Sequence, residues 1–262
     1  MFSDIWNRHP DEHENGFWLF GDDKDGDSFN QDDVQIWQNE KFEYAFSTDK
    51  YLNNSASRRL IDAIARTQGP YIDLACGPGM GLIPSVKNQC PEILCLATDA
   101  NAMLLKAWKE WLTRNSTARG IEFAQFSLFD IPVKDCCVKA YGGFLSLSST
   151  RDGGRGYDKA LSEIFRTLAP EGRLYAIESE WVDVHAACEV FYRSGIHPWN
   201  CFLEEQMTWH DRFLKNGFKI VFEEPYTNYV LNGKDNELGY AADKTGIKIE
   251  MQLNAFIIEK YS

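Results

Sequence analysis

The chain has 262 residues, 44% hydrophobic and 25% charged, an ordinary globular composition that excludes a wholly disordered chain, a collagen and a coiled coil. Its formal net charge is −12, and no basic footprint is evident that would neutralise the phosphates of a nucleic acid. No run approaches 18 apolar residues and the N-terminus lacks a basic segment followed by an apolar one, so we expect no membrane span, no signal peptide and a cytoplasmic protein.

Residues 1–54 are predicted to form an N-terminal part with its own character. Residues 1–50 hold 13 acidic and four basic side chains, so most of the excess charge lies there. Residues 1–35 are rich in Asp, Asn and Gly with interspersed aromatic residues, which favours an irregular arm that docks onto the body. Helical spacing over 33–46 predicts a cap helix.

Residues 55–178 alternate between strand and helix patterns. Such alternation indicates a mainly parallel sheet that helices cover on both faces. The predicted strands are 71–75, 93–98, 121–126, 138–144 and 173–178, and the predicted helices are 55–67, 80–88, 102–115 and 157–168.

The C-terminal part, within a main domain predicted over 55–262, departs from this alternation. Residues 179–216 form a predicted insertion rich in Trp, His and Phe. Residues 218–223 and 247–258 read as strands with no long helix between them, so we expect an antiparallel hairpin at one end of the sheet.

A glycine-rich turn follows the first predicted strand. Gly77 and Gly79 allow the backbone to turn tightly and to approach a ligand closely. Asp73 precedes this turn, and Asp99 ends the next strand, where a carboxylate can accept hydrogen bonds from both hydroxyls of a ribose. The pattern therefore predicts a site for a nucleotide or an amino-acid carboxylate.

These features resemble the class I S-adenosylmethionine-dependent methyltransferases, in the small-molecule branch that includes quinone-biosynthesis enzymes and is known as methyltransferase type 11. Residues 73–79 resemble the cofactor loop of the family, and 98–104 resemble its second motif. Residues 130–133 match an Asp-Leu-Pro-Phe motif, and 160–174 match a helix, turn and fifth strand. The resemblance implies a Rossmann-like, doubly wound sheet of seven mainly parallel strands with a C-terminal antiparallel hairpin.

The resemblance also implies S-adenosylmethionine as cofactor and S-adenosylhomocysteine as product. Ala75 stands where the first glycine is usual, Ser127 stands where an Asp commonly reads adenine, and Gly142 belongs to an unusual strand end. The implied cofactor contacts are Asp73, Ala75, Cys76, Gly77, Gly79, Asp99, Ala100, Met103, Ser127, Leu128 and Gly142.

The acceptor is expected to be a small molecule, and the methylated atom (oxygen, nitrogen or carbon) stays open. His185 is the candidate general base because it soon follows the fifth strand, although a surface or packing histidine explains it as well. The candidate pocket residues are Tyr44, Phe46, Glu178, Trp181 and His185.

We predict no metal, with zinc as the open alternative. His185, Cys188, His197 and Cys201 together offer four nitrogen and sulfur ligands of the kind that tetrahedral zinc takes. The short Cys-x-x-Cys knuckle that commonly accompanies such sites is missing from this stretch.

Three other functions stay open at this stage. The chain could bind S-adenosylmethionine without transferring a methyl group, or it could methylate protein or RNA. An Asn/Asp-Pro-Pro-Tyr motif, frequent in amino-group nucleic-acid methylases, is absent. A nicotinamide-dependent dehydrogenase normally has a third glycine where this chain has Leu82.

Overall fold

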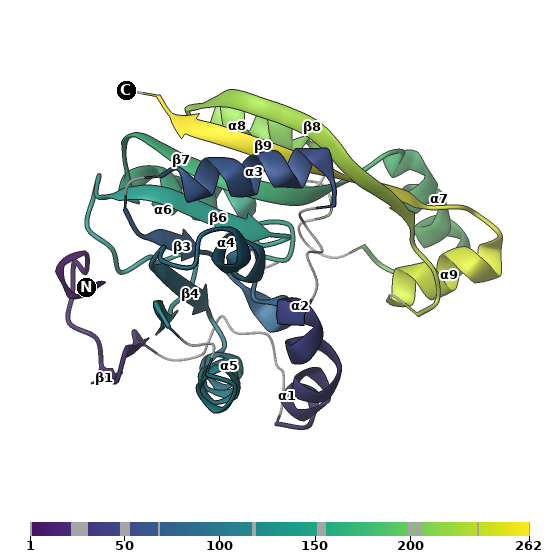
Figure 1. Cartoon of the computed structure of the whole chain (residues 1–262). Helices are drawn as coiled ribbons and strands as arrows, with labels where there is room; N and C mark the ends of the chain where they lie inside the picture. The colour runs from purple at the N-terminus through teal and green to yellow at the C-terminus, as the bar shows by residue number, and fades with distance from the viewer. Residues whose placement is uncertain are drawn as a thin grey trace.

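The structure, a computed structural model, has a single nine-stranded sheet in its described part, in the order β1-β2-β5-β4-β3-β6-β7-β9-β8 (Figure 1). Strands β1 and β9 run antiparallel to their neighbours, and the other adjacent pairs are parallel. The strands are β1 Glu12–Glu14, β2 Phe17–Leu19, β3 Tyr71–Asp73, β4 Cys95–Asp99, β5 Ile121–Gln125, β6 Val138–Phe144, β7 Leu168–Trp181, β8 Phe218–Val230 and β9 Glu250–Lys260. The described residues are 2–21, 31–47, 53–67, 69–116, 119–150, 156–198, 202, 206–234 and 236–261.

The predicted doubly wound sheet is confirmed, and its strand count is corrected from seven to nine. The run from β5 to β8 supplies the seven expected strands, with the antiparallel hairpin β8–β9 at one end. The two additional strands come from the arm, which is more regular than expected: β2 pairs in parallel with β5, placing Phe17 opposite Phe123. Burial of Phe17 and Trp18 accounts for this docking, and the Trp18 indole N–H donates to Glu122 Oε2 at 3.1 Å.

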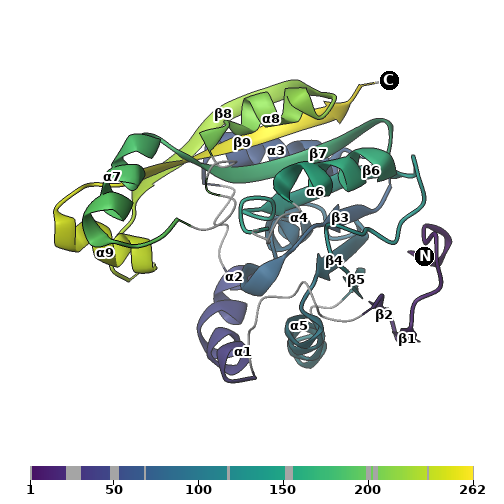
Figure 2. The same cartoon turned by 180° about the vertical axis from the view of Figure 1, so that it is seen from behind.

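Helices cover both faces of the sheet (Figure 2). Apolar residues of α3, α4 and α5 join the core on one face. Residues of α6 and α8, with the first residues of the arm, form the core on the other face. Within the described part, no helix has the length and apolarity needed to cross a lipid bilayer. These helices are α3 Ser55–Ala65, α4 Ile83–Gln89, α5 Ala102–Arg114, α6 Gly156–Thr167 and α8 Trp209–Lys215.

The C-terminal half carries a helical pair at the far ends of β7, β8 and β9 (Figures 1 and 2). Helices α7 (Val184–Ser194) and α9 (Glu237–Thr245) pack together around a small apolar core of their own. The pattern predicted no long helix between the last two strands, and the structure has a helix of nine residues there, α9. Asn236 caps its start by accepting from the Gly239 N–H, and Gly246 ends it with φ +70°. Strand β7 also continues to Trp181, so the insertion begins later than residue 179.

The predicted cap helix corresponds to a helical segment over residues 31–47. It comprises α1 (Gln31–Trp37), a π-helical turn (Gln38–Phe42) and α2 (Glu43–Ser47). This segment and the α7–α9 pair both lie on the side of the sheet where β3, β4 and β6 end (Figure 1). In a parallel α/β sheet this side holds the ligand crevice.

Candidate functional site

The glycine turn between β3 and α4 is tied to the end of β4. The Cys76 N–H donates to Thr98 O at 2.7 Å, and the Gly77 N–H donates to Asp99 Oδ2 at 2.9 Å. Ala75 and Gly77 have φ values of +44° and +56°, in the left-handed region that favours glycine. The backbone geometry of this turn therefore requires the glycine at 77 and strains the alanine at 75.

Two glycines of the turn present bare backbone. Among the described residues, nothing lies within 4 Å of the position that a Cβ would take on Gly77 or Gly79. Gly81 serves packing instead, because a Cβ there would lie 1.9 Å from Asp73 Oδ1. The turn thus offers a surface that a ligand can approach more closely than side chains would allow.

Asp99 combines a fixed orientation with partial exposure at the end of β4. Its Oδ2 accepts from the Gly77 N–H and its Oδ1 accepts from the Asn101 N–H, each at 2.9 Å. Asn101 in turn caps α5 by accepting from the Leu104 N–H at 2.9 Å. Asp99 is also partly exposed, so its carboxylate can face the hydroxyls of a ribose.

Asp73 lies fully buried beneath the turn. Its Oδ2 accepts from the Tyr71 hydroxyl at 2.6 Å and from the Leu82 N–H at 2.8 Å. Its Oδ1 accepts no hydrogen bond from any described residue. Burial raises the pKa of Asp73 to about 7, against the opposing effect of these two donors. An orphaned buried oxygen beside the turn suits the ammonium group of an amino-acid ligand, so the residues present fit S-adenosylmethionine.

The neighbouring thiol, Cys76, is buried as well. Burial raises the pKa of Cys76 well above its usual range, with the Asp99 carboxylate adding to the rise. A neutral buried thiol has little nucleophilic character, so its contribution to the turn is steric.

Gln125, the last residue of β5, is a residue that the sequence pattern did not indicate. Gln125 is buried, and its amide donates to Ala100 O and accepts from the Phe20 N–H, each at 3.2 Å. The arm is thereby joined to the segment that follows Asp99. Met103 stands on the first turn of α5 with 40% of its side chain exposed, where it can cover an adenine.

Ser127 and Leu128, the other predicted adenine contacts, lie just after β5. The Ser127 hydroxyl accepts from the Phe129 N–H at 3.1 Å and is partly exposed. Leu128 is buried in the apolar core. A hydroxyl can accept a further hydrogen bond, so a role for Ser127 stays a prediction.

The glycines at the end of β6 are explained by packing. Gly142 lies opposite Asp73, and a Cβ on it would lie 2.1 Å from the Tyr71 hydroxyl. A Cβ on Gly143 would lie 2.1 Å from Ser146 Oγ. The unusual strand end therefore accommodates the hydroxyl that orients Asp73, and the predicted cofactor contact of Gly142 stays a prediction.

Aromatic side chains on α2, β6 and β8 include two of the predicted pocket residues, Tyr44 and Phe46. On α2, Tyr44 is 53% exposed. The Phe46 ring packs against Trp108, with ring centroids 5.9 Å apart. Phe144, at the end of β6, meets the ring of Tyr226 edge-on at 6.3 Å. Burial raises the pKa of Tyr226, and the Tyr44 phenol adds to the rise. The sequence reasoning missed Tyr226 because β8 runs past the predicted end at residue 223.

Glu178 anchors the loop after β6, and its predicted place in the acceptor pocket stays a prediction. It is fully buried and accepts from the Leu147 N–H at 3.0 Å, and from the Ser148 N–H and hydroxyl at 2.8 and 2.7 Å. The Ser146 hydroxyl donates to it as well, at 3.2 Å. Burial raises the pKa of Glu178 to about 7, although these donors oppose the rise. These four hydrogen bonds tie Glu178 to the loop after β6 and orient that loop.

The remaining predicted residues lie in the helical pair at the ends of the strands. Trp181 ends β7 and meets Phe202 edge-on at 5.7 Å. His185 is exposed on the first turn of α7, where Asp183 caps the helix by accepting from its N–H. A role for His185 as base therefore stays a prediction.

The zinc alternative gains no support from the described part of the chain. Cys188 and His197 are exposed there, and Cys201 lies outside the described residues. No group of three potential metal ligands comes together among the residues that the structure describes.

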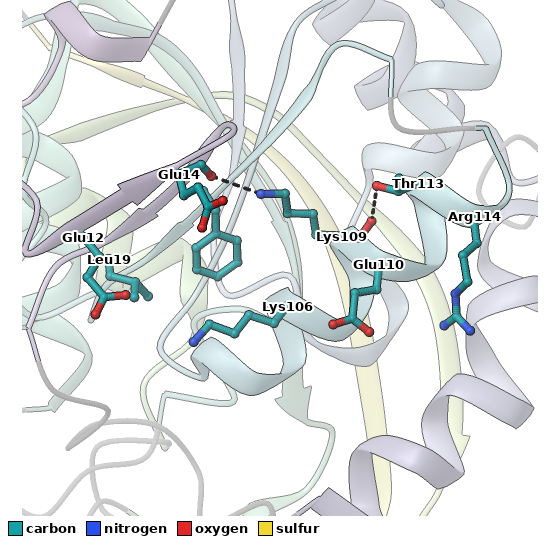
Figure 3. Close-up of a pocket in the computed structure, with 9 residues that line it drawn as sticks. Glu12, Glu14, Leu19, Lys106, Lys109, Glu110, Thr113 and Arg114 are labelled. Carbon is teal, nitrogen blue, oxygen red and sulfur yellow. Dashed lines mark hydrogen bonds between the residues drawn. The ribbon is translucent and has the colours of Figure 1, made fainter.

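A hollow of about 630 Å³ lies elsewhere, between the β1–β2 hairpin and α5 (Figure 3). Its floor is apolar, and Lys109 Nζ donates to Glu14 O at 3.1 Å across it. Three basic and three acidic side chains balance in the lining, so its charge favours neither an anion nor a cation. The lining residues are Glu12, Glu14, Phe17, Leu19, Lys106, Lys109, Glu110, Thr113 and Arg114.

The strand order, the bare glycine turn and the acids at the ends of β3 and β4 define a class I S-adenosylmethionine-dependent methyltransferase fold and cofactor site. The ubiE/COQ5 methyltransferase family matches residues 54–198, just over half of the chain, and the chain belongs to this family. The ubiquinone/menaquinone biosynthesis C-methyltransferase UbiE of Brucella anthropi is 25% identical over 126 residues, which cover 48% of this chain and 46% of that protein. The chain thus spans about half the length of this curated relative.

Solved structures share the fold at low sequence identity. The MccD protein has a TM-score of 0.55 at 14% identity, covering 79% of this chain and 99% of its own. A methyltransferase from Bacillus halodurans C-125 has a TM-score of 0.54 at 14% identity, covering 77% and 97%. A geranyl diphosphate methyltransferase in complex with S-adenosylmethionine has a TM-score of 0.52 at 11% identity, covering 90% and 93%.

Proposed function

We propose that this chain transfers the methyl group of S-adenosylmethionine to a small-molecule acceptor by in-line displacement. The observation that carries the proposal is the convergence of Asp99 and the bare face of Gly77 and Gly79 on one surface, with the unpaired Asp73 oxygen beneath it. The cofactor, when bound, supplies a methyl group on a sulfonium leaving group. The protein's main contribution is then to position the reactants and exclude water.

Each acid has a separate part in this proposal. Asp99 holds the turn and accepts hydrogen bonds from the ribose. Asp73, oriented by Tyr71, offers its free oxygen to the amino group of the cofactor. Glu178 fixes the loop after β6, where the acceptor would lie next to the methyl group.

The acceptor class is argued from the aromatic side chains around the crevice. Phe144 and Tyr226 pack edge-on, and Tyr44 is exposed on α2; such aromatic side chains suit a planar or apolar acceptor. His185 is the proposed base if the acceptor must lose a proton, because it stands on the helix that follows β7. An acceptor on protein or RNA is less favoured because the charge of the chain is strongly negative.

The first test is calorimetric titration of the full chain with S-adenosylmethionine, S-adenosylhomocysteine and NAD. Micromolar binding of both adenosyl compounds, with no binding of NAD, is the expected result. Binding of NAD alone would contradict the proposal and favour a dehydrogenase.

The second test measures S-adenosylhomocysteine release with separate panels of phenols, quinols and amines. Turnover with a member of a small-molecule panel is expected. Cofactor binding without turnover would favour a binding protein. Transfer of labelled methyl only to macromolecules from a cell extract would favour a protein or RNA methyltransferase.

A further inference from the structure

The indole of Trp108, which belongs to none of the motifs of the chain, donates a hydrogen bond to the cofactor turn. Trp108, on α5, is fully buried, and its Nε1–H donates to Gly77 O at 3.2 Å. The N–H of the same glycine donates to Asp99 Oδ2. Both polar groups of Gly77 are therefore fixed by side chains that come from the β4–α5 unit.

The bond from Trp108 is dispensable for satisfying the Gly77 carbonyl. That oxygen also accepts from the Met80 N–H at 3.3 Å, which closes the turn. Removal of the indole N–H would leave no orphaned acceptor there, so it would cost little stability. The bond fixes the direction of the carbonyl, and with it the plane of the peptide that carries the bare glycine surface.

The indole is itself held by the helical segment 31–47. Phe42 is fully buried, and its ring stacks on Trp108 with centroids 3.5 Å apart and planes 7° from parallel. Phe42 ends the π-helical turn Gln38–Phe42, an irregularity that is frequent at functional positions in helices. One continuous set of contacts thus runs from the N-terminal helix through the indole to the turn.

We propose that Trp108 is a positioning residue for cofactor binding and that its stack with Phe42 couples the docking of residues 31–47 to occupation of the turn. The inference rests on the proposed function, because it assumes that the turn binds S-adenosylmethionine. The coupling is reciprocal: a cofactor that orders the turn stabilises the docked helix, and a docked helix strengthens cofactor binding.

The test compares Trp108→Phe with the matched control Trp111→Phe. Phenylalanine keeps an aromatic ring on Phe42 but loses the N–H. Trp111 belongs to the same aromatic cluster, edge-on to Trp108 at 5.7 Å, and donates no hydrogen bond to the turn within the described part of the chain. We expect Trp108→Phe to raise the Kd for S-adenosylhomocysteine about three- to tenfold, as for the loss of one neutral hydrogen bond, with Tm near that of wild type. Trp111→Phe is expected to leave the Kd within about twofold of wild type.

Hydrogen exchange supplies the readout of coupling. In wild type, S-adenosylhomocysteine is expected to slow amide exchange across residues 31–47, and this protection should shrink in Trp108→Phe and in Phe42→Leu. An indole ¹⁵N spectrum of wild type should show the Trp108 resonance shifting on titration while that of Trp111 stays in place. This spectrum also decides the question if Trp108→Phe does not fold.

Three results would overturn the inference. The first is an unchanged Kd in folded Trp108→Phe, and the second is an equal loss of affinity in Trp111→Phe. The third is that the ligand does not protect residues 31–47 of wild type from exchange. Each of these presupposes that wild type binds S-adenosylhomocysteine. Failure of wild type to bind it would instead contradict the proposed function.

Discussion

The proposed cofactor and acceptor halves of the sheet each have an acid that holds a loop, Asp99 at the end of β4 and Glu178 three residues before the end of β7, and the two acids differ in exposure. At the end of β4, Asp99 accepts two backbone N–H groups and remains partly exposed. On β7, Glu178 also accepts two backbone N–H groups, and two hydroxyls besides, but is fully buried. Both carboxylates hold a loop, and only the exposed one retains a surface for a ligand. An acid near the end of a strand therefore indicates that a loop is held there, and it does not by itself indicate ligand binding.

The largest expected effect is on the exposed acid. Asp99→Ala should weaken binding of S-adenosylhomocysteine at least tenfold, because losing hydrogen bonds to a charged group costs about 1.5–3 kcal/mol. Asp99→Asn, which keeps one oxygen to accept a backbone N–H, should lose less affinity than Asp99→Ala. Calorimetry measures both, and wild-type affinity in Asp99→Ala would refute the placement of the site.

A second prediction concerns the boundary between the halves, where Gly142 faces Tyr71. Gly142→Ala places a methyl group 2.1 Å from the Tyr71 hydroxyl, so we expect a loss of about 1–3 kcal/mol in the free energy of unfolding. Tyr71→Phe in the same chain should recover part of this loss, because it removes the nearest atom. A double-mutant cycle in urea measures the coupling, and additive effects would show that the clash is relieved elsewhere.

A third prediction tests the buried acid. Glu178→Gln replaces one accepting oxygen by an NH₂ group, so about 1 kcal/mol of unfolding free energy should be lost and the amides of Leu147 and Ser148 should exchange faster. Affinity for S-adenosylhomocysteine should fall less than in Asp99→Ala. A larger fall would assign Glu178 to the cofactor half.

The difference in stability between wild type and Glu178→Gln should depend on pH. Burial raises the pKa of Glu178 to about 7, whereas an unfolded glutamate titrates at about 4.3. Between these values the folded chain binds more protons than the unfolded chain, so the contribution of Glu178 to stability falls as pH rises. The stability of wild type relative to Glu178→Gln should therefore decline from about pH 5 to about pH 7 and then level off. Urea denaturation at several pH values measures it, and a flat difference would contradict the raised pKa.

The smallest effect is expected at Ala75. Its φ of +44° is strained for alanine, and Ala75→Gly relieves this strain while increasing the freedom of the unfolded chain. The opposing terms leave a net gain of roughly 0.5 kcal/mol, visible as a slightly higher Tm. A lower Tm would mean that the Ala75 methyl group packs favourably.

The cofactor half could be predicted closely from the sequence because its signals are local. The glycine turn, Asp73 and Asp99 lie within one strand–turn–helix–strand unit, and the structure brings Asp99 onto the Gly77 N–H. The alternation of strands and helices predicted a mainly parallel sheet, and the family resemblance implied its doubly wound arrangement; the structure has both. Helix α9 was missed even though Asn236 and Gly246 bound it with ordinary capping signals.

The acceptor half could not be predicted, because its contacts join residues that are distant in sequence. Glu178 and Ser148, for example, are 30 positions apart. Nothing in the local pattern around Glu178 distinguishes a buried anchor from a ligand-binding acid. The hydrogen bonds from Ser146, Leu147 and Ser148 identify Glu178 as an anchor, and they depend on tertiary packing.

The arm that extends the sheet also changes how one chain meets another. Without β1 and β2, the edge of β5 would present unpaired backbone groups on which a strand of a second chain could add. Strand β1 replaces that edge with three exposed residues, Glu12, His13 and Glu14. A short acidic edge repels its own copy, and the repulsion reaches about 8–10 Å at physiological salt. The negative charge of the arm therefore has a colloidal consequence: it protects this border of the sheet against edge-to-edge aggregation, and added salt should weaken that protection.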